Sequence, residues 1–313
     1  MNNFHHIPVL LDEVIENLNI KENGIYIDGT LGGAGHSKYI LNKLSSGTLI
    51  GIDKDIDAIK ISKKRLLEDT NSKAKVILIH DKYENIKDIL YKLKIPKVDG
   101  ILLDLGVSSY QLDVKERGFS YKEDGPLDMR MDQRQEKTAE IILNSYTEEE
   151  LSNIIFEYGE ERYSRKIAAE IVRVRQKSPI KTIRQLTDII ESVISFNKKE
   201  GNRSKRTFQA LRIETNDELK NLGKTIEDGI KLLKDGGRML VISFHSLEDR
   251  IIKQKFIELE GRCICPKDLP ICSCNPISYG KIITKKIIAP SKKEIEQNRR
   301  SHSAKLRVFE KKG

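Results

Sequence analysis

The stretch that decides the fold of this chain is Asp28-Gly29-Thr30-Leu31-Gly32-Gly33-Ala34-Gly35-His36-Ser37. An apolar run at 25–27 precedes it, and apolar side chains at helical spacing follow it, at 40, 41 and 44. Strand, glycine turn and helix in this order form the first unit of a nucleotide-binding α/β sheet. Because glycine has no Cβ, the backbone can turn sharply and lie against a ligand, with free N–H groups at the helix start.

A second apolar run, at 49–52, ends in Asp53. This is about the spacing expected of an acid that accepts hydrogen bonds from ribose hydroxyls in such folds. The alternative role for Asp53 is to cap a helix that begins near residue 55. The glycine loop and the acid occur together in the right context, and this favours the nucleotide site.

The ligand of such a site is either a dinucleotide or S-adenosylmethionine. Here Asp28 ends the strand directly before the glycines, an order typical of methyltransferases, where the acid lies near the methionine ammonium group. A carboxylate so close to a pyrophosphate would repel it, because both groups are negatively charged. The pattern favours S-adenosylmethionine as the cofactor, with a nicotinamide-dependent dehydrogenase as the alternative.

Length, charge and hydropathy limit the class of protein. The chain has 313 residues, which predicts about two domains, and its net charge of +9 is typical of a protein with a polyanionic partner. No apolar run approaches the length of a membrane span, and the N-terminus lacks a signal-peptide pattern. We therefore expect a cytoplasmic protein that does not enter the membrane; its oligomeric state is unknown from the sequence.

Apolar strand patterns alternate with helical patterns in the first part of the chain. They predict parallel strands at 25–28, 48–53, 75–80 and 100–104, a fifth at 238–243, and a closing pair at 282–288 and 304–309. From 105 to about 215 no buried strand is predicted, and helical patterns lie near 139–144, 147–158, 162–177 and 182–195. We expect an α/β methyltransferase domain at 1–107 and 215–313, interrupted by an inserted helical domain for substrate recognition at 108–214.

Further polar side chains follow the strand ends, where ligands bind in open α/β sheets. Asp104 ends the fourth strand, where its carboxylate can hold the cofactor, accept a hydrogen bond from a substrate amine, or do both. Gln111 can reach the methionine part of the cofactor, while Ser108 and Ser109 can cap the next turn. Asp81 and Tyr83 follow the third strand, and either can border an adenine, Tyr83 by stacking; an ordinary capped helix start is the alternative for each.

His245 follows the fifth strand and is the second candidate catalytic residue. If that strand ends near Ser243, the imidazole faces the same cleft as Asp104. Ser246 and Asp249 fit a helix capping box, which is a structural role. A structural role is also the commoner one for a lone histidine, so the sequence leaves both open for His245.

Four cysteines occur as two Cys-x-Cys pairs, Cys263 with Cys265 and Cys272 with Cys274. Clustered thiols in a reducing compartment favour zinc. However, zinc-binding cysteines are usually separated by two residues, whereas each pair here is separated by one. Whether these thiols hold a metal stays open, and we assign no metal site. None of them follows the fourth strand, where a thiolate nucleophile would be required, and this counts against covalent catalysis.

Basic residues form three runs, which favour contacts with nucleic acid phosphates over a merely solvated surface. The first two lie in the expected insertion and the third near the C-terminus: Arg162, Arg165, Lys166, Arg173, Arg175 and Lys177; Lys198, Lys199, Arg203, Lys205 and Arg206; Arg299, Arg300, His302, Lys305 and Arg307.

Several motifs together closely resemble the bacterial 16S rRNA (cytosine-N4)-methyltransferase family (RsmH/MraW). They span nearly the whole chain, at 6–10, 28–37, 102–109, 116–120, 124–132, 158–162, 207–212, 243–250 and 300–307. The resemblance implies a class I methyltransferase fold and S-adenosylmethionine-dependent N4 methylation of a decoding-centre cytidine in 16S rRNA of the small ribosomal subunit. It further implies that the cofactor is bound by Ala34, Gly35, His36, Asp53, Tyr83, Asp104 and Gln111.

The mechanism expected from these residues is direct, in-line methyl transfer. Many amino-methyltransferases carry a Pro-Pro-aromatic motif after strand four, but here Leu105-Gly106-Val107 stands at that place. The sequence therefore leaves the proton acceptor unassigned. An RNA-binding ribosome-assembly factor without catalytic activity is the alternative from another functional class.

Overall fold

The chain folds into two compact units in a computed structural model that describes all residues except 1–7, 69–71, 195–202 and 264–275. The sheet unit comprises Met1–Gly106 and Leu219–Gly313, and the helical unit comprises Val107–Glu218. The second boundary lies four residues beyond the expected one. Helix α10 (Lys205–Asn216) continues past 214, and Arg212 at its end pairs with Glu218 at 2.9 Å, which keeps this segment with the helical unit.

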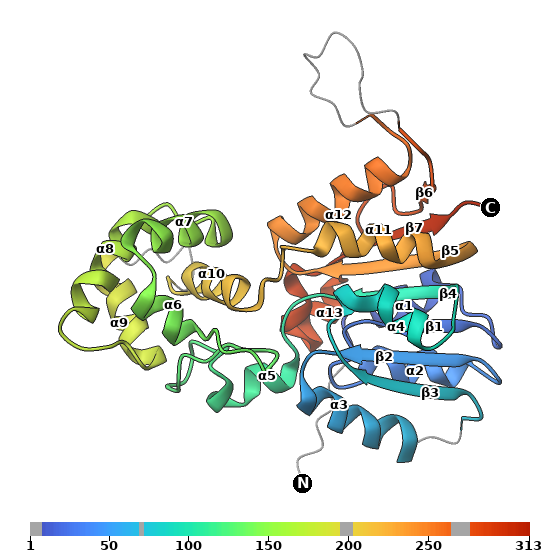
Figure 1. Cartoon of the computed structure of the whole chain (residues 1–313), viewed down its shortest axis with the longest axis horizontal. Helices are drawn as coiled ribbons and strands as arrows, with labels where there is room; N and C mark the ends of the chain where they lie inside the picture. Colours follow the sequence, from blue (N-terminus) through green and yellow to red (C-terminus); the bar gives the residue numbers. More distant parts are fainter. Residues whose placement is uncertain (1–7, 69–71, 195–202, 264–275) are drawn as a thin grey trace. The chain divides into compact units, whose positions relative to one another are not determined.

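The sheet unit is built on seven strands in the order β3-β2-β1-β4-β5-β7-β6 (Figure 1). The first five pair in parallel: β1 (Ile25–Asp28), β2 (Thr48–Asp53), β3 (Lys75–His80), β4 (Val98–Asp104) and β5 (Leu233–Ser243). β7 (Lys305–Lys311) is antiparallel to β5 and to β6 (Gly280–Ile282). The expected α/β sheet with an inserted helical segment is confirmed, and the chain reverses its strand order between β1 and β4, where ligands bind in such sheets.

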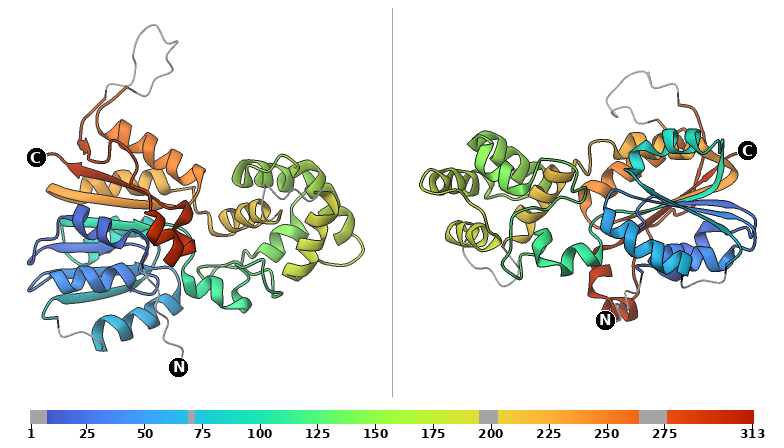
Figure 2. Two further views of the ribbon diagram at one scale, coloured as in Figure 1. Left: turned by 180° about the vertical axis from the view of Figure 1, so that it is seen from behind. Right: turned by 60° about the horizontal axis from the view of Figure 1, so that its bottom comes forward.

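Strand alternation explains why helices cover both faces of this sheet. Tyr26, Leu49 and Leu102 face one side, while Ile27, Ile50 and Ile101 face the other, and all six are buried. The first face packs on α1 (Leu11–Leu18), α2 (Gly35–Lys43), α3 (Ile56–Lys63) and the π-helical turn η1 (Lys64–Glu68). The second packs on α4 (Ile86–Lys92), α11 (Leu222–Leu232) and α12 (Ser246–Leu259), as Figure 2 shows.

Two of the predicted elements have different limits. The fifth strand, expected at 238–243, starts at Leu233 as β5. The penultimate strand, expected at 282–288, ends at Ile282. Beyond that point the Thr284 hydroxyl accepts the Val308 N–H at 3.0 Å, and this side-chain contact replaces a regular ladder bond. Short helical segments complete this unit: η2 (Tyr83–Asn85), α13 (Lys292–Gln297) and η4 (Arg299–Ser303).

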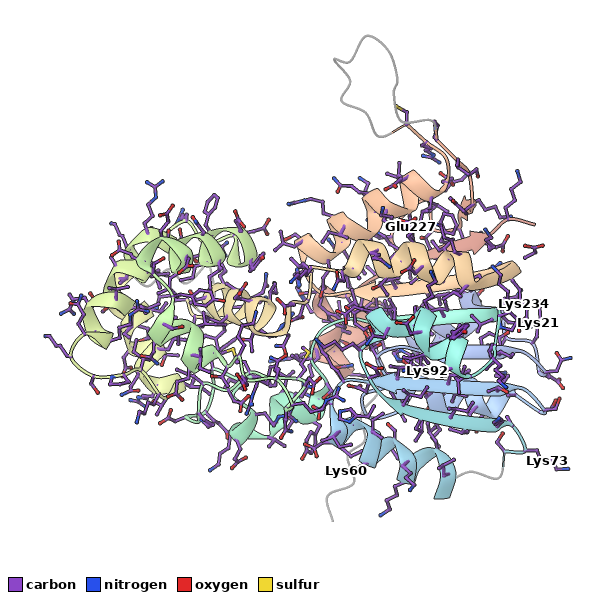
Figure 3. All side chains as sticks on the ribbon, viewed as in Figure 1. Lys21, Lys60, Lys73, Lys92, Glu227 and Lys234 are labelled. Atoms are coloured by element: carbon purple, nitrogen blue, oxygen red, sulfur yellow. The ribbon has the colours of Figure 1, made fainter. Side chains whose placement is uncertain are left out.

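The amino ends of the strands are held by Asp99, a buried carboxylate on β4. It accepts the Ile25 N–H at 2.9 Å and the Lys234 ammonium at 2.7 Å, and Lys21 lies 3.5 Å away. Lys21 and Lys234 lie together at this end of the sheet in Figure 3. At this edge a buried acid thus has two cations of the chain itself as partners.

The helical unit has its own core. Its helices are α5 (Ser109–Asp113), η3 (Lys115–Arg117), α6 (Ala139–Ser145), α7 (Glu148–Gly159), α8 (Ser164–Arg175), α9 (Ile183–Val193) and α10. Buried Ile and Leu side chains from α6 to α10 form one cluster, together with Leu127, Met129 and Met131 from the preceding irregular segment. The four helices predicted between 139 and 195 are confirmed.

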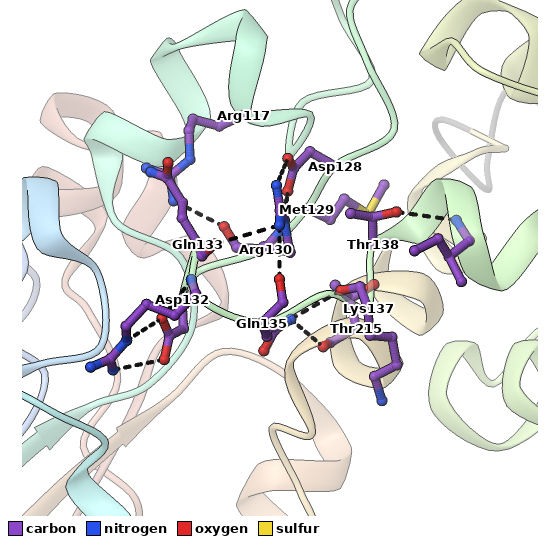
Figure 4. A network of polar contacts seen from close by, with 12 residues as sticks. Arg117, Asp128, Met129, Arg130, Asp132, Gln133, Gln135, Lys137, Thr138 and Thr215 are labelled. Atoms are coloured by element: carbon purple, nitrogen blue, oxygen red, sulfur yellow. Dashed lines mark hydrogen bonds and ion pairs between the residues drawn. The ribbon is translucent and has the colours of Figure 1, made fainter.

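Polar contacts hold the irregular segment 118–138 onto this core (Figure 4). Arg130 forms a two-point ion pair with Asp128, with both N···O distances 2.8 Å, and donates to the Gln135 carbonyl. Gln135 in turn donates to the carbonyl of Thr215 at 2.8 Å. These contacts make a scaffold for the helical unit out of the segment Gly125-Pro126-Leu127-Asp128-Met129-Arg130-Met131-Asp132.

Candidate active site at the carboxyl edge of the sheet

The glycine loop leaves β1 and enters α2 through two left-handed residues, Gly32 (φ 51°) and Ala34 (φ 59°). Its backbone is tied to both neighbouring strands, because Gly29 donates to the Leu102 carbonyl and Leu31 to the Ile52 carbonyl. Within the described chain, no side chain caps the N-terminus of α2. The first N–H groups of a helix have no partner within the helix, so those of Gly35 and His36 are suited to an anionic group of a ligand.

Asp53, at the end of β2, holds this loop through a hydrogen bond. Its Oδ2 accepts the Gly32 N–H at 2.7 Å and its Oδ1 accepts the Asp55 N–H at 2.8 Å. Burial raises the pKa of Asp53 to about 6. Asp53 is not the N-cap of α3, because Asp55 fills that position with its own carboxylate. Since each carboxylate oxygen has a second lone pair, Asp53 can still accept hydrogen bonds from ligand hydroxyls.

Asp28, the acid before the glycines, has both oxygens occupied by the loop itself. Oδ2 accepts the Ser37 hydroxyl at 2.7 Å, and Oδ1 accepts the Thr30 N–H at 3.2 Å. Burial raises the pKa of Asp28 to about 6. These contacts show that Asp28 holds the loop to α2, and its expected approach to the methionine ammonium group stays a prediction.

Asp104 lies at the end of β4, beside this loop. Its backbone N–H donates to the Thr30 hydroxyl at 2.6 Å, but its buried Oδ1 has no hydrogen-bond partner in the described part of the chain. Burial, together with the charges of Asp28 and Glu248, raises the pKa of Asp104 well above its ordinary value. A buried acceptor without a partner costs free energy, so this oxygen is the atom of the site best placed to receive a ligand.

His36, from the first turn of α2, faces Asp104. Its Nδ1 lies 3.7 Å from Asp104 Oδ2, and its Nε2 lies 2.8 Å from the carbonyl oxygen of Val9. Burial lowers the pKa of His36 to about 4, so the ring is neutral at pH 7. A carbonyl only accepts hydrogen bonds, so Nε2 carries the ring proton and Nδ1 presents a lone pair toward Asp104.

Tyr83 reaches the same region from the third strand. A Cβ built on Gly29 would lie 3.2 Å from the Tyr83 Cβ, so the start of η2 lies directly against the glycine loop. Asp81 has a local role instead, because its Oδ1 accepts from Lys82 N and from the Asn85 side chain, both at 2.7 Å. Tyr83 therefore borders the loop, and the contacts of Asp81 fit a capped helix start.

The segment after β5 differs from the expected one. His245, and not Ser246, is the N-cap of α12, and its capping-box partner is Glu248, not Asp249. His245 Nε2 lies 3.1 Å from Glu248 Oε1, and Glu248 Oε2 accepts the Phe244 N–H at 2.8 Å. Asp249 instead pairs with Arg307 on β7 at 2.7 Å. Glu248, buried beside Asp104, was missed from the sequence, although an acid three residues after the cap is the signal that indicates it.

Gln111 belongs to the helical unit, where it completes the capping box of α5. Its Oε1 accepts the Ser108 N–H at 2.9 Å, while its own N–H donates to the Ser108 hydroxyl at 3.2 Å. The suspected capping role of Ser108 is therefore confirmed. The sheet unit brings together Ala34, Gly35, His36, Asp53, Tyr83 and Asp104, with His245 adjoining through Glu248.

Several arginines of the basic runs have partners inside their own unit. Arg175 donates to the carbonyls of Leu143 and Tyr146, Arg203 to that of Ile194, and Arg307 pairs with Asp249. Arg165, Lys166 and Lys205 are exposed. Lys198 and Lys199 lie outside the described residues. The basic runs thus combine structural arginines with exposed charges.

Two further expectations concern metal and membrane. Among the described residues, no group of three or more His, Cys, Asp or Glu side chains has a metal-binding arrangement. Cys263 is exposed, and Cys265, Cys272 and Cys274 lie outside the described residues. In the same part of the chain, every helix is too short or too polar to cross a bilayer.

Comparison with known proteins identifies the family. The MraW methylase family matches residues 3–312. Proteins called ribosomal RNA small subunit methyltransferase H are similar along the whole chain. The one from Clostridium botulinum (strain Kyoto / Type A2) is 56% identical over 310 residues, covering 98% of this chain and 99% of the relative. Those from Caldicellulosiruptor saccharolyticus and Clostridioides difficile (strain 630) are 53% and 52% identical, with the same coverage.

A solved structure of a putative methyltransferase from Streptococcus mutans in complex with SAH aligns over 98% of this chain and 99% of its own, at 14% identity and a TM-score of 0.42. The assignment rests on the family match and the close relatives, and not on this distant likeness. The sequence pattern leaves two ligand classes open, S-adenosylmethionine and a dinucleotide. The family match decides for S-adenosylmethionine, and so against a dehydrogenase. The chain belongs to the MraW methylase family and is an S-adenosylmethionine-dependent methyltransferase.

Proposed function

We propose that this methylase transfers a methyl group from S-adenosylmethionine to the N4 amine of a decoding-centre cytidine in 16S rRNA, within the small ribosomal subunit. The name that its relatives share, ribosomal RNA small subunit methyltransferase H, supports RNA of that subunit as the substrate. The cytidine and its N4 atom come from the family resemblance of motifs such as 118–120, 125–132 and 243–250.

The residues at the carboxyl edge fit this donor. The carboxylates of Asp28, Asp104 and Glu248 gather there, with Asp28 and Glu248 buried, and no Lys or Arg of the described chain forms an ion pair with Asp104. At the opposite edge, Asp99 has Lys21 and Lys234. A carboxylate such as Asp104, without a counter-charge from the described chain, favours a cationic ligand.

We assign a part of the donor to each candidate residue. Asp53 accepts from the ribose hydroxyls, Tyr83 borders the adenine, and the N–H groups after Ala34, those of Gly35 and His36, face the carboxylate of the methionine part. Asp104 lies at the methionine end, and the family resemblance adds Gln111 to the residues that bind the donor. When bound, S-adenosylmethionine supplies a methyl group activated by its positively charged sulfur.

The single observation that carries the chemistry is the buried Oδ1 of Asp104, which has no partner in the described chain. The N4 amine of cytosine is a weak nucleophile, because its lone pair is delocalised into the ring. A carboxylate oxygen that accepts one amine hydrogen helps to localise this pair and can take the proton as the new N–C bond forms. Residues 105–111 contain no cysteine, which supports direct transfer. In this assignment His245 is a positioning residue, since both of its ring nitrogens face Glu248.

The helical unit supplies RNA contacts in this proposal. Arg165 and Lys166 on α8 and Lys205 at the start of α10 are exposed, and lysine and arginine are the side chains that neutralise phosphates. These residues are the better candidates among the basic runs, since Arg175 and Arg203 bind backbone carbonyls of their own unit.

The test is methyl transfer to purified small subunits from cells lacking this methylase, followed by nucleoside mass spectrometry. We expect N4-methylcytidine to form at one position on the subunits, with large subunits as the negative control. Methylation at another atom or in another RNA would refute the assignment. Tight subunit binding with no transfer to any precursor would favour an assembly factor instead.

A further inference from the structure

The three carboxyl groups of the acid cluster at the carboxyl edge, those of Asp28, Asp104 and Glu248, differ in their hydrogen-bond donors. Asp28 has two donors for its oxygens, and Glu248 has the backbone N–H groups of Phe244 and His245. Asp104 has no donor on Oδ1, and His36 Nδ1 lies 3.7 Å from its Oδ2. The carboxyl group of Asp104 is thus the one member of the cluster that the described chain leaves without a hydrogen-bond donor.

The tautomer of His36 makes this contact unfavourable for an ionised Asp104. Because Val9 holds the ring proton on Nε2, the Nδ1 lone pair points toward a carboxylate lone pair. Two acceptors facing each other repel, whereas a proton on Oδ2 would turn the same contact into an O–H···N hydrogen bond after a small closing movement. The two other acids that face Asp104, Asp28 from β1 and Glu248 from α12, act in the same direction.

We propose that Asp104 is protonated in the free enzyme, with the proton directed at His36 Nδ1, and that binding of the cationic methyl donor expels this proton into solvent. The inference rests on the proposed position of the donor beside Asp104. In this step the Asp104 O–H bond breaks, the electron pair stays on Oδ2, and the proton passes to the buffer. The carboxylate formed is then able to accept the amine proton, so His36 acts as a positioning residue.

Proton release can be counted without any RNA substrate. The full chain is titrated with S-adenosylmethionine by calorimetry at pH 7.0, 7.5, 8.0 and 8.5, in buffers of different ionisation enthalpy. The slope of observed enthalpy against buffer enthalpy then reports protons released for each donor bound. Asp28 and Asp53, whose pKa values lie at about 6, are mostly ionised in this range. We expect release at pH 7 that declines as pH rises, and donor affinity that rises by up to about tenfold per pH unit where release is complete.

Three variants assign the proton. Asp104→Asn should abolish the release. His36→Gln keeps an N–H donor for the Val9 carbonyl but has no ring nitrogen facing Asp104, so its release should shift to lower pH. Asp57→Asn removes a carboxylate of α3 that lies outside the proposed site and should leave the count unchanged.

The outcomes separate this inference from the proposed function. Donor binding with no proton release in the wild-type chain, or equal release in Asp104→Asn, would overturn the inference while leaving methyl transfer intact. If Asp104→Asn binds the donor too weakly to titrate, the test is the pH dependence of donor affinity in the wild-type chain and in His36→Gln. Identical pH profiles for these two proteins would overturn the inference. No donor binding at any pH would contradict the proposed function itself.

Discussion

Replacing Asp104 by Asn keeps the shape of the side chain and removes its charge. The backbone N–H of residue 104 would still donate to the Thr30 hydroxyl, and the strand register with Ile242 does not involve the side chain. The amide also has an N–H group that can donate to His36 Nδ1. We therefore expect a folded protein with an altered reaction centre.

The magnitude follows from charge and burial. Two unit charges about 4 Å apart interact by about 4 kcal/mol at an effective dielectric constant of about 20. The side chain of Asp104 is 23% exposed, so screening is incomplete, and the chain supplies no competing cation among its described residues. If the charge acts mainly in the transition state, methyl transfer should fall by about 10²–10³-fold, the loss typical of one preorganised electrostatic contact.

Single-turnover methylation of small subunits measures this loss at saturating S-adenosylmethionine. A rate that stays low at saturation, with donor affinity reduced far less, supports the transition-state role. Asp53→Ala is the matched contrast, because it should weaken donor binding by about 1.5–3 kcal/mol through the removal of charge-assisted bonds and recover at saturation. Full recovery of Asp104→Asn at saturation would refute the reasoning and leave Asp104 as a ligand of the donor only.

Four further predictions concern stability, pH, RNA and thiols. Asn216→Ala should lower the free energy of unfolding by about 3 kcal/mol in chemical denaturation, because it removes three hydrogen bonds, the buried ones to Met129 and Met131 and a part-buried one to Arg212; an unchanged midpoint would contradict this. Burial raises the pKa of Asp28 to about 6, so its contribution to stability is present below about pH 4 and lost as pH rises through 6. Asp28→Asn should therefore remove a decline of roughly 3 kcal/mol between pH 4 and 8, and parallel pH profiles would disprove it. Replacing both Lys166 and Lys205 by Gln should flatten the slope of log binding constant against log salt concentration for RNA. The change should be up to about 0.9 for each duplex phosphate that is no longer neutralised. Arg173→Gln, at a residue paired with Glu170, should change this slope less. Replacing all four cysteines by Ser should leave methyl transfer intact, and a folded variant that binds the donor without methylating would show the opposite.

Local patterns in the sequence were enough to find the edge of the sheet where the site lies. Strands β1, β2 and β3 have the predicted limits, and Asp28, Asp53 and Asp104 end three of the strands as expected. A buried parallel strand is a short apolar run, and an acid directly after it must lie at the carboxyl edge. The same periodicity located the helices between 139 and 195.

The tertiary structure alone decided which of these acids has a partner. Asp53 and Asp28 have the glycine loop and α2 as donors, whereas Asp104 faces the lone pair of His36, 68 residues earlier in the chain. It also decided that Glu248, and not Asp249, lies in the acid cluster, since Asp249 forms an ion pair with Arg307. These pairings depend on β1 lying between β2 and β4 and on β7 lying beside β5. Strand order of this kind follows from the packing of the whole sheet, and residue spacing along the chain does not encode it.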